Sequence, residues 1–290
     1  MNPLLSAWFR YKFKKFTEPQ RYAIVNIHRR ENTLISAVTG SGKTLSAFAA
    51  VLNELITLSE QNLLEERVYC IYVSPLRALS NDIKRNLKEP LEEIQKAEKK
   101  IGKKIDFRIA VRTGDTTTSE RSTQLRKPPH ILITTPESLA ILLNAPKFVE
   151  NLKKANWIIV DEIHSLAENK RGIHLSLTLE RLQRLNPEIC RVGLSATIAP
   201  IEEMAKFLVG MKNEKETRAC KIVDCKLEKG IDLQVLSPLP DMINTSQEEI
   251  HKALYGKIHE LIQAHKTTLI FTNTRSATER VVDYLKEQYS

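Results

Sequence analysis

The residues best suited to chemistry lie in one stretch, AVTGSGKT at residues 37–44. It follows a β-prone run at 33–36 and precedes a helical pattern. A strand, a glycine-rich turn and a helix N-terminus make an anion site, because backbone N–H groups and the helix dipole point at the turn. Lys43 can reach the β- and γ-phosphates of a nucleotide, and the Thr44 hydroxyl can bind Mg²⁺. The stretch therefore predicts a nucleotide phosphate site, although Ala37 stands where the usual P-loop pattern has glycine.

Two carboxylates, Asp161 and Glu162, follow the buried-strand pattern at 157–160. A carboxylate in this position can hold Mg²⁺, directly or through water, opposite a phosphate loop. Its neighbour Glu162 can orient or deprotonate an attacking water. His164 is either a packed core histidine or a link from the nucleotide to the Ser195-Ala196-Thr197 stretch, and spacing leaves both interpretations open.

Gln20 has two interpretations. In the first interpretation, Gln20 is part of a capped amphipathic helix that packs on the sheet, because Thr17 is a good N-cap and Pro19 suits a first helical turn. Its amide can also donate and accept hydrogen bonds at once, which suits an adenine edge.

The order of the predicted elements indicates an α/β fold. Buried-strand patterns alternate with helical ones, and the strands are expected at 33–36, 67–74, 107–112, 130–134, 157–160, 190–194 and 221–223. Long helices are expected from Pro75 to about Lys100, after Gly172 and after Pro200. This alternation predicts a doubly wound parallel sheet with helices on both faces. Such sheets bind ligands at the carboxyl ends of their strands, so the polar clusters that follow the strands are expected along one edge.

The sequence changes character near Lys226, and we expect a first domain at 1–225 and the start of a second at 226–290. Strand patterns are seen at 231–237 and 267–271, with a helix at about 246–265 and another at the end. About sixty residues are too few for a doubly wound sheet, so the second domain is expected to be truncated.

Composition limits the class of protein. The 290 residues hold 44 Lys and Arg against 35 Asp and Glu, a formal net charge of +9, which favours nucleic acid as a partner although a solvated surface gives the same count. No apolar run approaches the ~18–20 residues of a membrane span, and the first residues do not have the pattern of a secretory signal. The cysteines favour reduced thiols over a zinc or disulfide framework. We expect a cytoplasmic monomer without a membrane partner. The cysteines are Cys70, Cys190, Cys220 and Cys225.

Taken in order, these stretches resemble the motif series of superfamily 2 helicases. The series is Gln20, 37–44, 74–79 (SPLRAL), 113–115 (TGD), 134–139 (TTPESL), 161–164 (DEIH), 195–197 (SAT) and 271–275 (FTNTR). The run DEIHSL at 161–166, its continuation through Lys170-Arg171-Gly172, and Asn273-Thr274-Arg275 resemble the Lhr (large helicase-related) group.

That resemblance implies two RecA-like domains with ATP and Mg²⁺ in the cleft between them. The implied nucleotide-binding residues are Gln20, Thr39, Gly40, Ser41, Gly42, Lys43 and Thr44. The implied catalytic residues are Lys43, Asp161, Glu162 and His164, with Thr44 and Asp161 on Mg²⁺ and with Ser195 and Thr197 linking hydrolysis to strand movement. The implied nucleic-acid contacts are Pro75, Leu76, Arg77, Thr113, Gly114, Asp115, Thr135, Pro136, Glu137, Ser138, Thr272, Asn273, Thr274 and Arg275.

These residue types suit a grip on phosphates, because backbone N–H groups, hydroxyls and arginines at helix starts hold a strand without reading its sequence. The resemblance favours an ATP-dependent helicase or translocase on single-stranded DNA with 3′-to-5′ movement, although the residues themselves do not give polarity. An RNA helicase, a nucleotide-dependent binding module and, more distantly, a small-molecule kinase are the alternatives. A kinase has no need of the loops at 74–79, 113–116 and 134–138.

The resemblance also sets an expectation for activity. Helicases of this kind supply arginine fingers from later motifs of the second domain, and these lie beyond Ser290. An arginine finger contributes about 10³–10⁵ to the rate of phosphoryl transfer. We therefore expect this chain to bind ATP and nucleic acid weakly and to hydrolyse ATP poorly.

Overall fold

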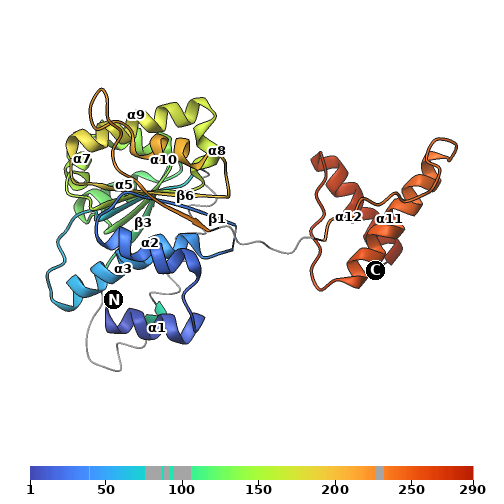
Figure 1. Ribbon diagram of the computed structural model, residues 1–290, viewed down its shortest axis with the longest axis horizontal. Coiled ribbons are helices and arrows are strands. Elements are labelled where there is room, and N and C mark those ends of the chain that lie inside the picture. Colours follow the sequence, from blue (N-terminus) through green and yellow to red (C-terminus); the bar gives the residue numbers. More distant parts are fainter. Residues whose placement is uncertain (39, 76–86, 88–91, 95–105, 226–231, 290) are drawn as a thin grey trace. The chain divides into compact units, whose positions relative to one another are not determined.

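The computed structural model describes residues 1–38, 40–75, 87, 92–94, 106–225 and 232–289 (Figure 1). They fall into two compact units, Met1–Glu228 and Lys229–Ser290. Most of the helix expected from Pro75 to Lys100 lies outside the described residues. The predicted contacts of Thr39, Leu76 and Arg77 lie outside them too.

Unit 1 is built on a seven-stranded sheet in the order β3-β4-β2-β5-β6-β1-β7, with every pair parallel. Parallel strands covered on both faces form continuous apolar runs, and all four residues of Trp157–Val160 are buried. This confirms the doubly wound prediction. The strands are β1 (Thr33–Ala37), β2 (Cys70–Val73), β3 (Ile109–Arg112), β4 (Ile131–Thr134), β5 (Trp157–Val160), β6 (Cys190–Ser195) and β7 (Lys221–Cys225).

Helices cover both faces of this sheet, and each face has its own apolar core. Successive strand residues point to opposite faces, so Ile35 packs with α2 and α3 whereas Leu34 packs with α9 and α10. Figure 1 shows α2 and α3 on one side of the sheet and α9 and α10 on the other. The helices are α1 (Pro3–Phe13), α2 (Glu18–His28), α3 (Lys43–Glu60), α5 (Thr118–Arg126), α6 (Pro136–Leu142), α7 (Pro146–Leu152), α8 (Ile163–Ala167), α9 (Lys170–Leu185) and α10 (Ile201–Val209).

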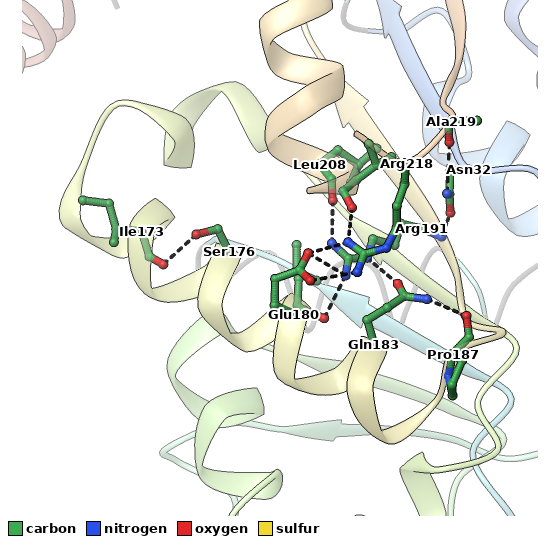
Figure 2. A network of polar contacts seen from close by, with 12 residues as sticks. Asn32, Ile173, Ser176, Glu180, Gln183, Pro187, Arg191, Leu208, Arg218 and Ala219 are labelled. Atoms are coloured by element: carbon green, nitrogen blue, oxygen red, sulfur yellow. Dashed lines mark hydrogen bonds and ion pairs between the residues drawn. The ribbon is translucent and has the colours of Figure 1, made fainter. Parts of the chain in front are cut away.

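An ion network around a buried arginine ties α9 to β6 and to the end of α10 (Figure 2). Arg191 is 1% exposed, and its guanidinium donates to Gln183 Oε1 at 2.8 Å and to the Leu208 carbonyl at 3.1 Å. Glu180 accepts from Arg191 at 3.1 Å and from Arg218 at 2.6 and 2.9 Å. Burial lowers the pKa of Arg191 to about 10, which is still well above neutral pH. The buried guanidinium is therefore charged at neutral pH and requires the Glu180 carboxylate as its counter-charge.

Unit 2 contains α11 (Gln247–Ala264) and α12 (Arg275–Tyr289), which confirms both predicted helices. Their aromatic side chains stack, with 4.2 Å between the ring centroids of Tyr255 and Tyr284. The strand predictions at 231–237 and 267–271 are wrong for the described residues, since 232–237 and 267–271 form no ladder. A strand needs a neighbour for its N–H and C=O groups, and the described part of unit 2 offers none. Val235 and Phe271 are accordingly 98% and 88% exposed.

No helix among the described residues is long and apolar enough to cross a membrane.

The network around Arg191 gives a stability prediction. Replacing Glu180 by Gln leaves a buried guanidinium without its counter-charge, so we expect the free energy of unfolding to fall by about 3 kcal/mol in chemical denaturation. Glu203→Gln is the matched control, because it removes a carboxylate from an exposed pair with Lys206. Equal midpoints for the two variants would contradict the account of the network.

Candidate nucleotide and nucleic-acid site

The phosphate loop turns β1 into α3. Gly40 and Gly42 have φ of +82° and +87°, a conformation that strains any residue with a β-carbon. Lys43 begins α3, and its buried ammonium donates to the Ala37 carbonyl at 2.6 Å. The Ser41 hydroxyl is buried without a hydrogen-bond partner among the described residues. A turn lined by such groups suits a phosphate, which can accept from the hydroxyl and from the ammonium.

Lys43 faces the two carboxylates predicted to serve the same nucleotide. Burial lowers the pKa of Lys43, and the charges of Glu162 and Asp161 oppose that shift. The carboxyl end of β5 and the start of α3 therefore share one electrostatic environment. Thr44, half-buried in the first turn of α3, completes a set of hydroxyl and carboxylate oxygens of the kind that Mg²⁺ prefers.

Asp161 is held by a tyrosine that sequence reasoning missed. The Tyr72 hydroxyl donates to Asp161 Oδ2, and the Glu162 N–H donates to Oδ1 at 3.0 Å. Burial raises the pKa of Asp161, while the Tyr72 hydrogen bond acts in the opposite direction. Tyr72 gave no signal in the sequence because it lies inside an apolar strand run. The parallel pairing of β2 with β5 is what brings it to the carboxylate.

A chain of contacts runs from Glu162 to the end of β6. Glu162 has a left-handed backbone with φ of +47°, and its Oε2 lies 3.2 Å from His164 Nε2. His164 Nδ1 accepts the Ala196 N–H at 3.2 Å and lies 3.3 Å from Ser195 Oγ. With Nδ1 accepting a backbone N–H, the proton of the neutral ring is on Nε2 and points at Glu162. This geometry favours a linking role for His164 over a packed core histidine. Thr197 follows at an exposed position.

Gln20 belongs to a capping box at the start of α2. Its Oε1 accepts the Thr17 N–H at 2.9 Å, and the side chain is buried. Its Nε2 faces the phosphate loop, because a β-carbon added to Gly42 would lie 2.8 Å from it. Both interpretations of Gln20 are therefore compatible, since the oxygen caps the helix and the amide N–H₂ points toward the nucleotide loop.

The predicted nucleic-acid loops of unit 1 follow β2, β3 and β4. After β4, Thr135 caps α6, where its Oγ1 accepts the Ser138 N–H at 3.3 Å and donates to Ser138 Oγ at 3.1 Å. Thr135, Pro136 and Ser138 are all buried, and Glu137 is exposed beside them. Pro75, two residues after the end of β2, is buried as well. Short polar groups at the start of a helix are suited to phosphate oxygens.

The loop after β3 is shaped by an arginine. Arg121 of α5 donates to the Gly114 carbonyl at 3.2 Å and to the Thr116 carbonyl at 2.8 Å. The Thr113 N–H donates to Thr116 Oγ1 at 2.9 Å, and Asp115 is exposed at the tip. The backbone of the loop is thus fixed from within.

The strand order separates the two sets of loops. The loops predicted to contact nucleic acid follow β3, β4 and β2, whereas the nucleotide residues follow β5, β6 and β1. All these loops lie on the same edge because the strands are parallel. Unit 1 therefore has its predicted nucleotide residues on one half of the edge and its predicted nucleic-acid residues on the other.

The predicted contacts of unit 2 lie at the start of α12. The Thr272 hydroxyl donates to the Thr274 carbonyl at 3.0 Å, and Thr274 Oγ1 accepts the Ala277 N–H at 3.1 Å. Asn273 lies between them, and Arg275 is the first residue of the helix. The geometry is a hydroxyl-capped helix N-terminus, as in the loop after β4.

The DEAD/DEAH box helicase model matches residues 17–205, and the chain belongs to this family. It is 56% identical over 289 residues to the ATP-dependent helicase Lhr-Core of Methanothermobacter thermautotrophicus, covering 100% of this chain and 33% of that protein. The Lhr helicase/uracil glycosylase of Escherichia coli is 34% identical over 311 residues, covering 100% of this chain and 20% of the relative.

A solved structure is similar along nearly the whole chain. The helicase Lhr of Mycobacterium smegmatis, bound to ssDNA and AMP-PNP, has a TM-score of 0.84 at 38% identity and covers 99% of this chain and 36% of that one. These findings confirm the RecA-like fold and the resemblance to the superfamily 2 Lhr group. The chain spans about a third of the length of the Lhr-Core relatives.

The two ends of the Gln20 amide can be tested separately, because its oxygen caps α2 and its N–H₂ group points toward the nucleotide loop. Gln20→Glu keeps the cap, because a carboxylate oxygen accepts the Thr17 N–H as an amide oxygen does. It removes the N–H₂ donor, so we expect affinity for a fluorescent ATP analogue to fall about three- to tenfold with the thermal midpoint unchanged. Gln20→Ala removes both functions and is expected to lower both quantities. If the Glu variant binds the ATP analogue and its GTP counterpart as the parent does, Gln20 does not contact the base.

Proposed function

We propose that this chain is the nucleotide-binding part of an ATP-dependent motor that moves on single-stranded DNA. The observation that carries the proposal is the contact chain from Glu162 through His164 to Ser195 and Ala196. This chain of contacts links Glu162, a carboxylate suited to activating water, with the carboxyl end of β6 at the same edge of the sheet. A simple nucleotide-binding module has no need of such a link.

In the proposed reaction, Lys43, Ser41 and the N–H groups of the turn hold the phosphates of ATP. Thr44 and Asp161 would hold Mg²⁺, which supplies charge neutralisation at the β- and γ-phosphate oxygens. Tyr72 keeps the Asp161 carboxylate oriented, and its hydrogen bond favours the ionised form that a metal requires. Glu162, with an oxygen beside the Nε2 proton of His164, orients the attacking water and accepts its proton.

The proposed preference for DNA rests on the similarity of this chain to a relative whose structure contains DNA. The Mycobacterium smegmatis relative was solved with ssDNA, and the loops after β2, β3 and β4 supply backbone and hydroxyl groups for a strand's phosphates. Contacts to the phosphate backbone hold DNA and RNA strands alike, so RNA is the alternative outcome of the binding test. Movement from 3′ to 5′ is part of the same proposal.

We expect the 290 residues alone to hydrolyse ATP slowly. The described part of unit 2 has two helices and no strand, so a second RecA-like sheet is not formed within it. The arginine fingers implied by the resemblance come from that domain. The whole protein's activity is therefore proposed for a longer chain like the relatives.

The proposal is tested by the ATPase rate with and without single-stranded DNA. Glu162→Gln removes the general base but keeps the size of the side chain, so we expect the slow rate of the parent to fall to background while affinity for AMP-PNP stays within about a factor of two. Glu168→Gln, an exposed carboxylate just after α8, is the matched control and should hydrolyse normally.

Two outcomes would count against the proposal. An ATPase rate that Glu162→Gln does not change would remove the catalytic assignment. Parent protein that binds AMP-PNP but neither a DNA nor an RNA strand would be a nucleotide-binding module instead. Competition between matched DNA and RNA strands decides the substrate.

A further inference from the structure

Arg171 connects two of the loops described above and has no role in the proposed reaction. Its Nε donates to Glu137 Oε1 at 2.7 Å, and its Nη2 donates to the Pro75 carbonyl at 2.7 Å. Glu137 lies in the first turn of α6 after β4, and Pro75 lies two residues after the end of β2. One guanidinium from α9 therefore bridges two neighbouring loops that belong to the predicted nucleic-acid surface.

The backbone of Arg171 is fixed by the cap at the start of α9. Asn169 caps this helix, and its Oδ1 accepts the Arg171 N–H at 2.9 Å and the Gly172 N–H at 3.3 Å. A β-carbon on Gly172 would lie 2.0 Å from the Leu166 carbonyl oxygen, so α8 and α9 meet too closely for any side chain there. The far half of α9 is anchored by the Glu180 network (Figure 2). Arg171 thus extends from a rigid support.

The charge of Glu137 makes its partner important. Its exposed carboxylate lies on the predicted nucleic-acid surface, where its negative charge would repel the phosphates of a bound strand. Burial acts to raise the pKa of Glu137, but hydrogen bonds, first that from Arg171, outweigh it and lower the pKa. Glu137 is therefore ionised at neutral pH, with Arg171 as its counter-charge.

We propose that Arg171 is a positioning residue for nucleic-acid binding, which holds Pro75 in place and offsets the negative charge of Glu137 on the surface that contacts the nucleic-acid strand. This inference rests on the proposed function. Because α9 directly follows α8, which begins after Glu162 and carries His164, the same support links the strand-binding loops to the nucleotide site.

The experiment measures binding of a fluorescent single-stranded oligodeoxythymidine by anisotropy, with AMP-PNP present and salt varied. We expect Arg171→Gln to weaken binding about fivefold. Arg181→Gln is the matched control, because Arg181 is an exposed arginine on the same helix that bonds Asn144 Oδ1 at 2.6 Å, and it removes the same charge. Affinity for AMP-PNP should be the same in both variants.

A second substitution separates positioning from a merely structural role. In Arg171→Gln the Glu137 charge is left without its partner, so adding Glu137→Gln should recover part of the lost affinity. Arg171→Lys keeps the charge but not the two fixed donors, and it should fall between the parent and Arg171→Gln. The dependence of log Kd on log salt should keep its slope in Arg171→Gln, because a positioning residue releases no counterion itself.

Three results would overturn the inference. Equal affinities for Arg171→Gln and Arg181→Gln would remove any special role for Arg171. No recovery in the double variant would remove the role of Glu137. A salt slope smaller by about one would make Arg171 a direct phosphate ligand. Failure of the parent protein to bind the oligonucleotide is a different result, since it would refute the proposed function before any variant is compared.

Discussion

The site depends on one electrostatic arrangement, the placing of Asp161 and Lys43 in a region that water barely reaches. Each charge is costly there unless something compensates it. Burial raises the pKa of Asp161 and lowers that of Lys43, and each group acts against the shift of the other. Tyr72 and the Glu162 N–H supply the hydrogen bonds that the carboxylate needs. The site is thereby prepared for a ligand with opposite charges of its own, such as a metal–nucleotide complex.

The parallel sheet is what makes this arrangement available. Its strand order places β5, β6 and β1 side by side, so that loops distant in sequence meet at one edge. The remaining strands of the sheet, β2, β4 and β3, carry the polar loops that are predicted to hold single-stranded nucleic acid. His164 connects β5 with β6, and Arg171 connects α9 with the loops after β2 and β4. Side-chain contacts thus add to the backbone ladders in joining the loops along this edge.

Much of the fold could be predicted because its signals are local. The alternation of apolar strand runs with helical patterns was enough to predict the parallel sheet, and the AVTGSGKT run was enough to predict a glycine turn between β1 and α3. The strands expected at 231–237 and 267–271 were wrong because a strand also depends on a neighbour that pattern alone does not supply. Tyr72 escaped notice for a related reason, since its partner Asp161 is set by the register of β2 against β5.

Arg171 shows another limit of local reasoning. It was noted only as part of a family-like run, because nothing near it in sequence reveals that its acceptors are Glu137 and the Pro75 carbonyl. For His164 the spacing left two interpretations open, a packed core histidine and a link to the Ser195-Ala196-Thr197 stretch. The contact geometry favours the link. Side-chain partners set by tertiary packing are the part of a site that sequence alone leaves open.

The proposed role of His164 is to couple the nucleotide site to the bound DNA strand, and the effect of nucleotide on DNA affinity reports this coupling. The affinity for single-stranded DNA is measured with and without AMP-PNP, in the parent and in His164→Ala. Coupling between two ligands is a free energy that either ligand reports. We expect AMP-PNP to change DNA affinity about fivefold or more in the parent and to leave it nearly unchanged in the variant, with AMP-PNP affinity preserved. The same change in both proteins would show that the coupling does not pass through His164.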